Sequence, residues 1–211
     1  MHNIMLVSTV HKEIGNCNAD ELCKIIREIG PEVIFLEALE ETYSMYQKSS
    51  FFSFGVYHEK LEISAIQKYS FNASFEYVPV LDIGLSDAFE RKYSALCENS
   101  DLQKLIDNFN SLASENGFKF LNSAESIRLQ EEMRMLEGGL LNGSELSKAF
   151  NEDIDAYENS MVRNIYSYCK KHHFETAMFM CGVAHRESIT RKIVKDNGQE
   201  EIELKWTLLG N

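Results

Sequence analysis

Basic residues are scarce in this sequence. Its 211 residues include 21 Lys and Arg against 33 Asp and Glu, which gives a formal net charge of −12. Proteins that bind a nucleic-acid backbone or an anionic membrane need positive surface to meet the phosphates. The composition therefore argues against both partners. It favours a soluble chain whose acidity could concentrate cations near a site.

Cysteine pairs with the spacing of a metal or redox motif are also missing. The five cysteines are an odd number and no two of them form a CxxC pair, so neither a disulfide framework nor a zinc finger is predicted. Cys169 and Cys181 stand in apolar surroundings and are expected to be buried as small hydrophobic residues. Thiols that stay reduced are typical of a cytoplasmic protein.

Long apolar runs are absent as well. No segment approaches the ~20 apolar residues of a membrane span. The N-terminal "MHNIMLVSTVHKE" has neither the basic region nor the cleavage site of an export signal. We therefore expect no membrane partner and a cytoplasmic location. Hydrophobic residues make up 44% and charged residues 26%, a balance that suits a single globular domain over residues 1–211.

Short apolar segments alternate with helical ones along the chain. "NIMLVSTVH", "EVIFLEALEE", "FEYVPVLDIG" and "FETAMFMCGVAH" predict buried strands, and the alternating "EEIELKWTLL" predicts a final one. Asn18 predicts the start of a helix that Gly30 and Pro31 end. Strand, helix and strand in succession form a βαβ unit, which implies parallel strands. The prediction is an α/β fold with a mainly parallel central sheet flanked by helices.

A helical insertion is predicted at about residues 92–150. Helical periodicity runs from residue 86 to about 127 with a break near "SENGFKF", and the glycines of "MLEGGLLNG" predict a connector. A long helix is expected to begin at Ser144 or Asp153 and to end near Lys171. The aromatic "TYSMYQKSSFFSFGVYHEK" is expected to be a loop or a small helical insertion over the sheet edge.

Four predicted strands each deliver an ionisable group to their carboxyl end. In chain order these are His11, Glu37, Asp82 and His185. Open parallel sheets bind ligands outside the carboxyl ends of their strands, so these side chains could share one site. Imidazole and carboxylate groups bind divalent metals, and without a metal they act as general base and orienting partner for a water. The residues leave both open, together with the simpler possibility that each side chain caps a turn or faces solvent.

The order of these motifs resembles the TraB/PrgY–Tiki–erythromycin esterase superfamily, to which ChaN-like proteins are related. That group has two GxxH motifs, a Glu after the second strand, an apolar helix containing "AI", a strand ending in Asp and an Arg soon after it. The corresponding stretches here are "STVH", "VIFLE", "SAIQKYS", "VPVLD", "DAFERKY", "YENSMVRNI" and "GVAH". The motifs are short, but their order spans nearly the whole chain.

The resemblance implies a hydrolase of the TraB/Tiki type. Tiki proteins resemble metal-dependent proteases, erythromycin esterases open a lactone with no metal implied, and TraB/PrgY proteins are linked to peptide-pheromone control. By this likeness, His11, Glu37 and His185 would hold a divalent metal such as Mn, Co or Zn, or would position a water directly. The expected substrate is a peptide or a small-molecule ester.

The resemblance also implies roles for three further residues. Asp82 and Glu158 would orient the metal ligands or act as acid and base, and Arg91 would bind an anionic substrate group or an oxyanion. The alternative is a non-catalytic protein that binds a peptide or small ligand in the same pocket.

The chain departs from the family pattern in three places. Ser8 replaces the glycine of the first GxxH motif, and Tyr157 stands where many members carry Arg. No family motif matches residues 92–150, which are expected to select the substrate.

Overall fold

One parallel sheet organises the protein. The structure is a computed structural model that describes residues 2–39, 60–141, 145–196 and 202–210. The sheet has the order β3-β2-β4-β1-β5, and every neighbouring pair of strands is parallel. The predicted α/β fold is confirmed. The strands are β1 (His2–Thr9), β2 (Val33–Leu39), β3 (Glu76–Leu81), β4 (Thr176–Gly182) and β5 (Leu204–Leu208).

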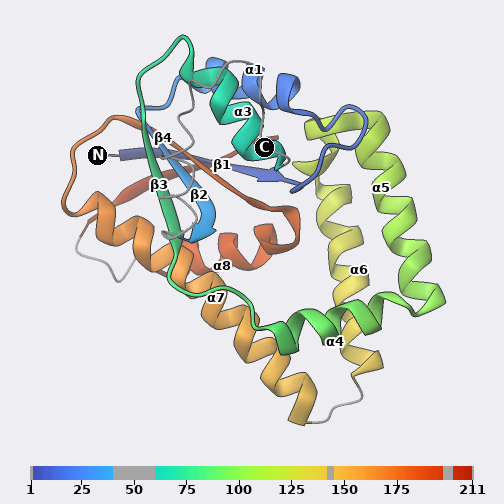
Figure 1. The fold of residues 1–211 in the computed structure, drawn as a ribbon. Coiled ribbons are helices and arrows are strands. Elements are labelled where there is room, and N and C mark those ends of the chain that lie inside the picture. The colour runs from blue at the N-terminus through green and yellow to red at the C-terminus, as the bar shows by residue number, and fades with distance from the viewer. Residues whose placement is uncertain (1, 40–59, 142–144, 197–201, 211) are drawn as a thin grey trace.

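Helices cover both faces of the sheet, which is why its strands are apolar on both sides. In β4, Met178 and Met180 pack into one hydrophobic layer, while Phe179 and Cys181 pack into the other. The first layer includes α1 (Ala19–Ile29) and α3 (Leu61–Ser70), and the second includes α7 (Glu145–Cys169) and α8 (Arg186–Asp196). Figure 1 shows the sheet between these two pairs of helices.

The ends of α1 follow the sequence prediction. The side chain of Asn18 accepts hydrogen bonds from the backbone N–H groups of Asp20 and Glu21. Gly30 ends the helix in the left-handed conformation at φ 58°, which glycine adopts without a Cβ clash. Cys169 and Cys181 are buried, as expected for small hydrophobic residues.

Three helices fill the predicted insertion between β3 and α7. They are α4 (Asp87–Cys97), α5 (Ser100–Leu121) and α6 (Ala124–Leu140). The break expected near "SENGFKF" is present at Gly117, whose φ of 60° and ψ of −147° interrupt α5. The connector expected at the glycines of "MLEGGLLNG" is wrong for Gly138 and Gly139, which lie inside α6. Leu129 and Met133 already anchor α6 in the core, which offsets the low helix propensity of glycine.

Several expectations concern the surface or fall outside the described residues. Most of the aromatic stretch predicted as a loop or insertion lies in residues 40–59, which are outside the described residues.

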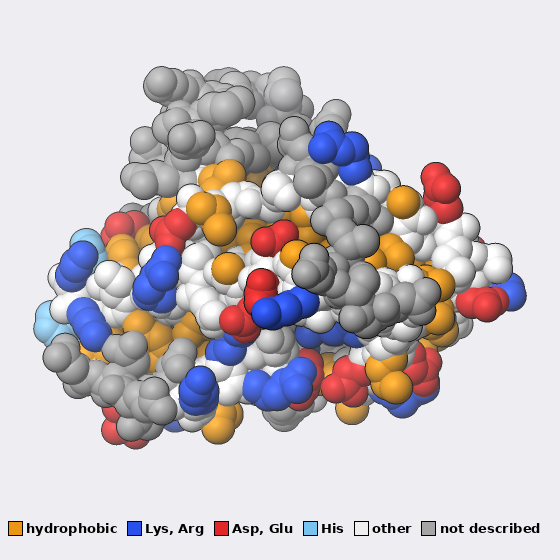
Figure 2. Space-filling view, turned by 90° about the horizontal axis from the view of Figure 1, so that it is seen from below, with side chains coloured by type: hydrophobic (Ala, Val, Ile, Leu, Met, Phe, Trp, Pro, Cys, Tyr) orange, Lys and Arg blue, Asp and Glu red, His pale blue; other side chains and the backbone are white. Residues whose placement is uncertain are grey.

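None of the described helices is long and apolar enough to cross a membrane. On the face seen in Figure 2, basic side chains are scattered among acidic and apolar ones.

A buried arginine fastens the end of β4 to distant parts of the chain. Arg186 is 1% exposed, and its guanidinium donates to Asn122 Oδ1 at 2.8 Å, Ser8 Oγ at 3.2 Å and Leu209 O at 2.8 Å. The side chain of Asn122 also bonds the backbone N–H and C=O of Ser8. Ser8, the departure from the GxxH pattern, therefore supplies a hydroxyl acceptor to the arginine that follows His185.

Replacing Asn122 with Ala should destabilise the protein by about 3 kcal/mol, because it leaves the buried N–H of Ser8 without its acceptor and removes the closest acceptor of Arg186 Nη1. Urea unfolding monitored by circular dichroism measures this change. The control is Asn116→Ala, an exposed asparagine of the same helix, which should shift the unfolding free energy by no more than about 0.5 kcal/mol. Equal effects of the two substitutions would contradict this account of the junction.

Candidate active site

Three of the predicted side chains converge at the carboxyl ends of the central strands. Strands β2, β4 and β1 are neighbours in the sheet, so Glu37, His185 and His11 meet at one edge. The carboxylate of Glu37 lies between the two imidazoles. Its Oε1 is 3.9 Å from His11 Nε2 and 3.6 Å from His185 Nε2.

A buried carboxylate stands behind each imidazole. His11 Nδ1 lies 3.1 Å from Glu62 Oε1, and His185 Nδ1 lies 3.0 Å from Glu158 Oε1. Glu62 is 3% exposed and Glu158 is 1% exposed. Because a carboxylate accepts a hydrogen bond from Nδ1–H, each ring directs Nε2 away from that carboxylate, and Nε2 carries the lone pair whenever the ring is neutral. Both Nε2 atoms face Glu37.

Two donors fix the carboxylate of Glu37. The hydroxyl of Tyr157 donates to Oε1 at 2.7 Å, and the backbone N–H of Gly182 donates to Oε2 at 2.6 Å. Burial and the nearby charge of Glu37 raise the pKa of Tyr157, so its hydroxyl stays protonated and able to donate. The tyrosine that departs from the family pattern thus holds the central carboxylate in place.

Glu62 links His11 to the end of β1. Its Oε1 also accepts the hydroxyl of Thr9 at 2.7 Å. Burial pushes the pKa of Glu62 up, but the hydrogen bonds from His11 and Thr9 and the charge of His11 bring it below its ordinary value. Within the described ranges Glu62 Oε2 is buried without a hydrogen-bond partner. Glu62, His11 and Glu37 line a cavity of about 10 Å³, about the room that one water needs.

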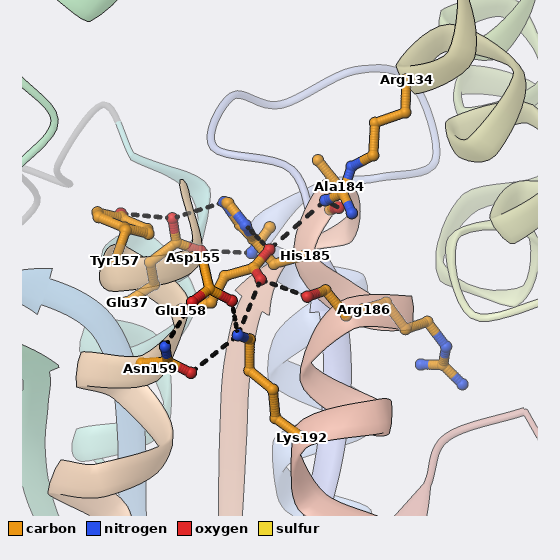
Figure 3. Close-up of polar contacts among 12 residues, drawn as sticks. Glu37, Arg134, Asp155, Tyr157, Glu158, Asn159, Ala184, His185, Arg186 and Lys192 are labelled. Atoms are coloured by element: carbon orange, nitrogen blue, oxygen red, sulfur yellow. Dashed lines mark hydrogen bonds and ion pairs between the residues drawn. The ribbon is translucent and has the colours of Figure 1, made fainter. Parts of the chain in front are cut away.

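Residues of α8 and α6 also contact the carboxylate of Glu158. Ser188 donates a hydrogen bond to Oε2, and Lys192 Nζ lies 3.9 Å from the same oxygen. Arg134 Nη2 lies 3.5 Å from Oε1 and donates to the backbone carbonyl of Ala184. Figure 3 shows Lys192 and Arg134 approaching Glu158 from different directions. These contacts hold the carboxylate in place for its bond to His185.

Gly182 leaves space at the centre of the site. A Cβ built on this residue would lie 3.4 Å from Glu37 Oε2, 3.5 Å from His11 Nε2 and 3.6 Å from His185 Cδ2. Its φ of −55° and ψ of 137° are accessible to any residue, so the backbone does not require glycine here. The missing side chain instead leaves room between the three reactive groups.

The donor types at this centre suit a divalent cation. They are two imidazole nitrogens and one carboxylate, although no group of three or more His, Cys, Asp or Glu among the described residues is already spaced as a ligand set. Ligands around a tetrahedral metal lie about 3.4 Å apart, a spacing that follows from bonds of about 2.1 Å. His185 is close to that separation from Glu37, whereas His11 must move inward. The side chain of His11 is 49% exposed and has room to do so.

The other two predicted residues are not joined to this centre. Asp82 follows β3, the edge strand, and bonds Asn164 Nδ2 at 2.8 Å and the guanidinium of Arg163, both on α7. Arg91 is exposed on α4. In the part of the chain that the structure describes, no hydrogen bond or ion pair links Asp82 or Arg91 to either histidine. The centre therefore contains His11, Glu37, Glu158 and His185 from the predicted set.

Sequence reasoning missed Glu62 and the residues that hold the carboxylates of the site. Glu62 has a signal in the sequence, since it is a charged residue between Leu61 and Ile63 in an otherwise apolar stretch, and all three are buried. The polar partners of Glu158 and Glu37 lie far away in sequence and give no local signal: Arg134, Lys192 and Tyr157.

Comparisons of this chain with protein-family models, with curated proteins and with solved structures give no match.

Glu62 should raise the pKa of His11 above its ordinary value of 6.5, mainly through their hydrogen bond and then through its charge. The stabilisation from this pair is complete below about pH 6.5 and is lost as the pH rises through the raised pKa of the folded state. NMR titration of His11 in chelator-treated protein should give a midpoint above 6.5 that falls in Glu62→Gln. Glu28→Gln removes an exposed glutamate and should leave the midpoint unchanged, so an equal fall there would refute the assignment.

Proposed function

We propose that this protein is a hydrolase of the TraB/Tiki type that activates a water between His11, Glu37 and His185 to cleave a peptide or ester bond. One observation carries the proposal: two imidazoles, each bound through Nδ1 to a buried carboxylate, direct Nε2 toward the same third carboxylate. A histidine whose Nδ1 is bound to a carboxylate is a general base at Nε2.

The residues of the chain divide the work of activating water. Glu37, held by Tyr157 and Gly182, accepts one hydrogen bond from the water and orients it. An Nε2 lone pair takes the proton as the water attacks the carbonyl carbon, and the carboxylate behind that ring stabilises the imidazolium. The protonated imidazole then returns the proton to the leaving amine or alcohol.

In the metal-dependent form of the proposal, a divalent cation (Mn, Co or Zn) activates the water, and the two Nε2 atoms would bind the cation instead of taking a proton. His11 and His185 through Nε2, and Glu37 through a carboxylate oxygen, would hold it. Such a cation lowers the pKa of a bound water and so supplies a nucleophile at neutral pH. Glu62 and Glu158 would fix the orientation of the two imidazoles, as buried carboxylates do behind histidine ligands in metal sites.

Hydrolysis of a fluorogenic peptide library and of p-nitrophenyl esters tests this function. We expect turnover that chelator treatment and re-addition of Mn, Co or Zn modulate, and a loss of about 10²-fold or more in kcat/KM for His11→Ala and His185→Ala. The control is His173→Ala, an exposed histidine beyond the end of α7. Tight binding of a peptide without turnover under any metal would instead support the non-catalytic binding protein.

Gly182→Ala should lower kcat by about 10²-fold, because the new methyl group fills the space between the water-activating groups. Its backbone conformation suits alanine, so we expect the unfolding free energy to change by no more than about 1 kcal/mol. Steady-state kinetics and urea unfolding measure the two effects.

Gly84→Ala serves as the control, because its added Cβ would contact only Leu39 Cδ1, at 3.5 Å. Full activity of Gly182→Ala would show that the reaction does not need the space beside Gly182.

A further inference from the structure

A second cavity lies on the Nδ1 side of His185, beyond Glu158. It has a volume of about 140 Å³ and lies between α6, α7 and α8. Glu158 is shared by the cavity and the candidate active site, because it lines the cavity and is hydrogen-bonded to His185. A cavity of about 150 Å³ is large enough for a benzene molecule. The space therefore suits a ligand of about that size.

The carboxylates that line this cavity are already engaged. Glu137 is hydrogen-bonded to the hydroxyl of Tyr93, and burial raises the pKa of Glu137. Asp155 pairs with Lys192. Glu158 is hydrogen-bonded to the imidazole of His185 and to the hydroxyl of Ser188. Each acidic group thus has a hydrogen-bond partner within the protein, and the charge of Arg134 also acts on Glu137.

Arg134 is different, because part of its guanidinium is unused. Its Nη2 donates to Ala184 O and lies near Glu158, which fixes the position of the group. Among the described residues, its Nε and Nη1 donors meet no acceptor, and the side chain is 36% exposed. A fixed guanidinium with spare donors is the arrangement that binds a carboxylate through charge-assisted hydrogen bonds.

Apolar side chains also line the cavity. Phe150 is 5% exposed and stacks on Phe89 with ring centroids 4.4 Å apart. Ile154 and Leu141 line the same space. Gly138, which also lines it, has no atom within 4 Å of where a Cβ would stand. A ligand here can contact both a cation and hydrocarbon.

We propose that this cavity is a binding site for a small organic acid, with its carboxylate on Arg134 and its apolar body against Phe150 and Ile154. The site belongs to the helical insertion and to α7, and it needs neither metal nor water activation. It therefore goes beyond the proposed hydrolase function, and binding can be measured whether or not the protein turns over a substrate.

Three probes with one apolar body test the ligand class: 4-methylpentanoate, its amide 4-methylpentanamide and its amine 4-methylpentan-1-amine. Isothermal titration calorimetry or ligand-observed NMR should show binding of the acid, about tenfold weaker binding of the amide, and no binding of the amine. Arg134→Gln should weaken acid binding about tenfold and remove the difference between acid and amide. Arg91→Gln, at an exposed arginine of α4, should change neither.

Two neighbouring glycines locate the site. Gly138→Leu should fill the cavity and abolish acid binding, whereas Gly139→Leu should bind as the wild type does. Neither glycine has an atom within 4 Å of an added Cβ, and only Gly138 lines the cavity. Both variants should melt at or above the wild-type temperature, because leucine replaces glycine inside a helix.

Three results would overturn the proposal. They are acid and amide binding equally well, the amine binding best, or acid binding that survives Gly138→Leu. Absence of binding by every probe would overturn it too. Because the readout is binding, loss of hydrolytic activity in any variant leaves this test unaffected.

Discussion

The carboxylate of Glu37 is the constraint on which the rest of the site depends. It sits inside β2 and is 8% exposed, so the fold must supply donors to replace the water it has lost. One donor is the N–H of Gly182, available because β4 ends beside β2 and has no side chain there. The other is the Tyr157 hydroxyl, which α7 supplies from the second hydrophobic layer. Once both are in place, the carboxylate can face the two histidines.

The two imidazoles are supported from opposite layers of the molecule. Glu62 comes from α3 on one face of the sheet, and Glu158 comes from α7 on the other. The centre is therefore tied to both hydrophobic layers, so packing changes in either one would alter an imidazole orientation. Of the two carboxylates behind the imidazoles, only Glu158 lines the second cavity, so His185 and His11 have different surroundings.

The sequence predicts the sheet well because its signals are local. Apolar runs, the Asn18 cap and the Gly30 stop each describe a few consecutive residues, and they place His11, Glu37 and His185 at strand ends. The position of a strand end does not show where the side chain there points: Asp82 also follows a strand, but its side chain bonds residues of α7. The positions of Arg134 and Lys192 relative to Glu158 depend on how helices that are distant in sequence pack against one another, which no local signal predicts. Gly138 and Gly139 show the same effect, because packing keeps α6 helical through them.

Strand order has a consequence for how the chain folds. β1 and β2 follow one another in sequence but do not pair, since each pairs with β4, which lies far along the chain. The first βαβ unit therefore has a gap at its centre until β4 inserts. Pairing of β4 with β1 and β2 brings Gly182 and His185 to the site in a single step. A chain in which β4 has not yet paired would hold Glu37 without the N–H of Gly182 and without His185, so this arrangement of side chains forms only when the sheet is complete.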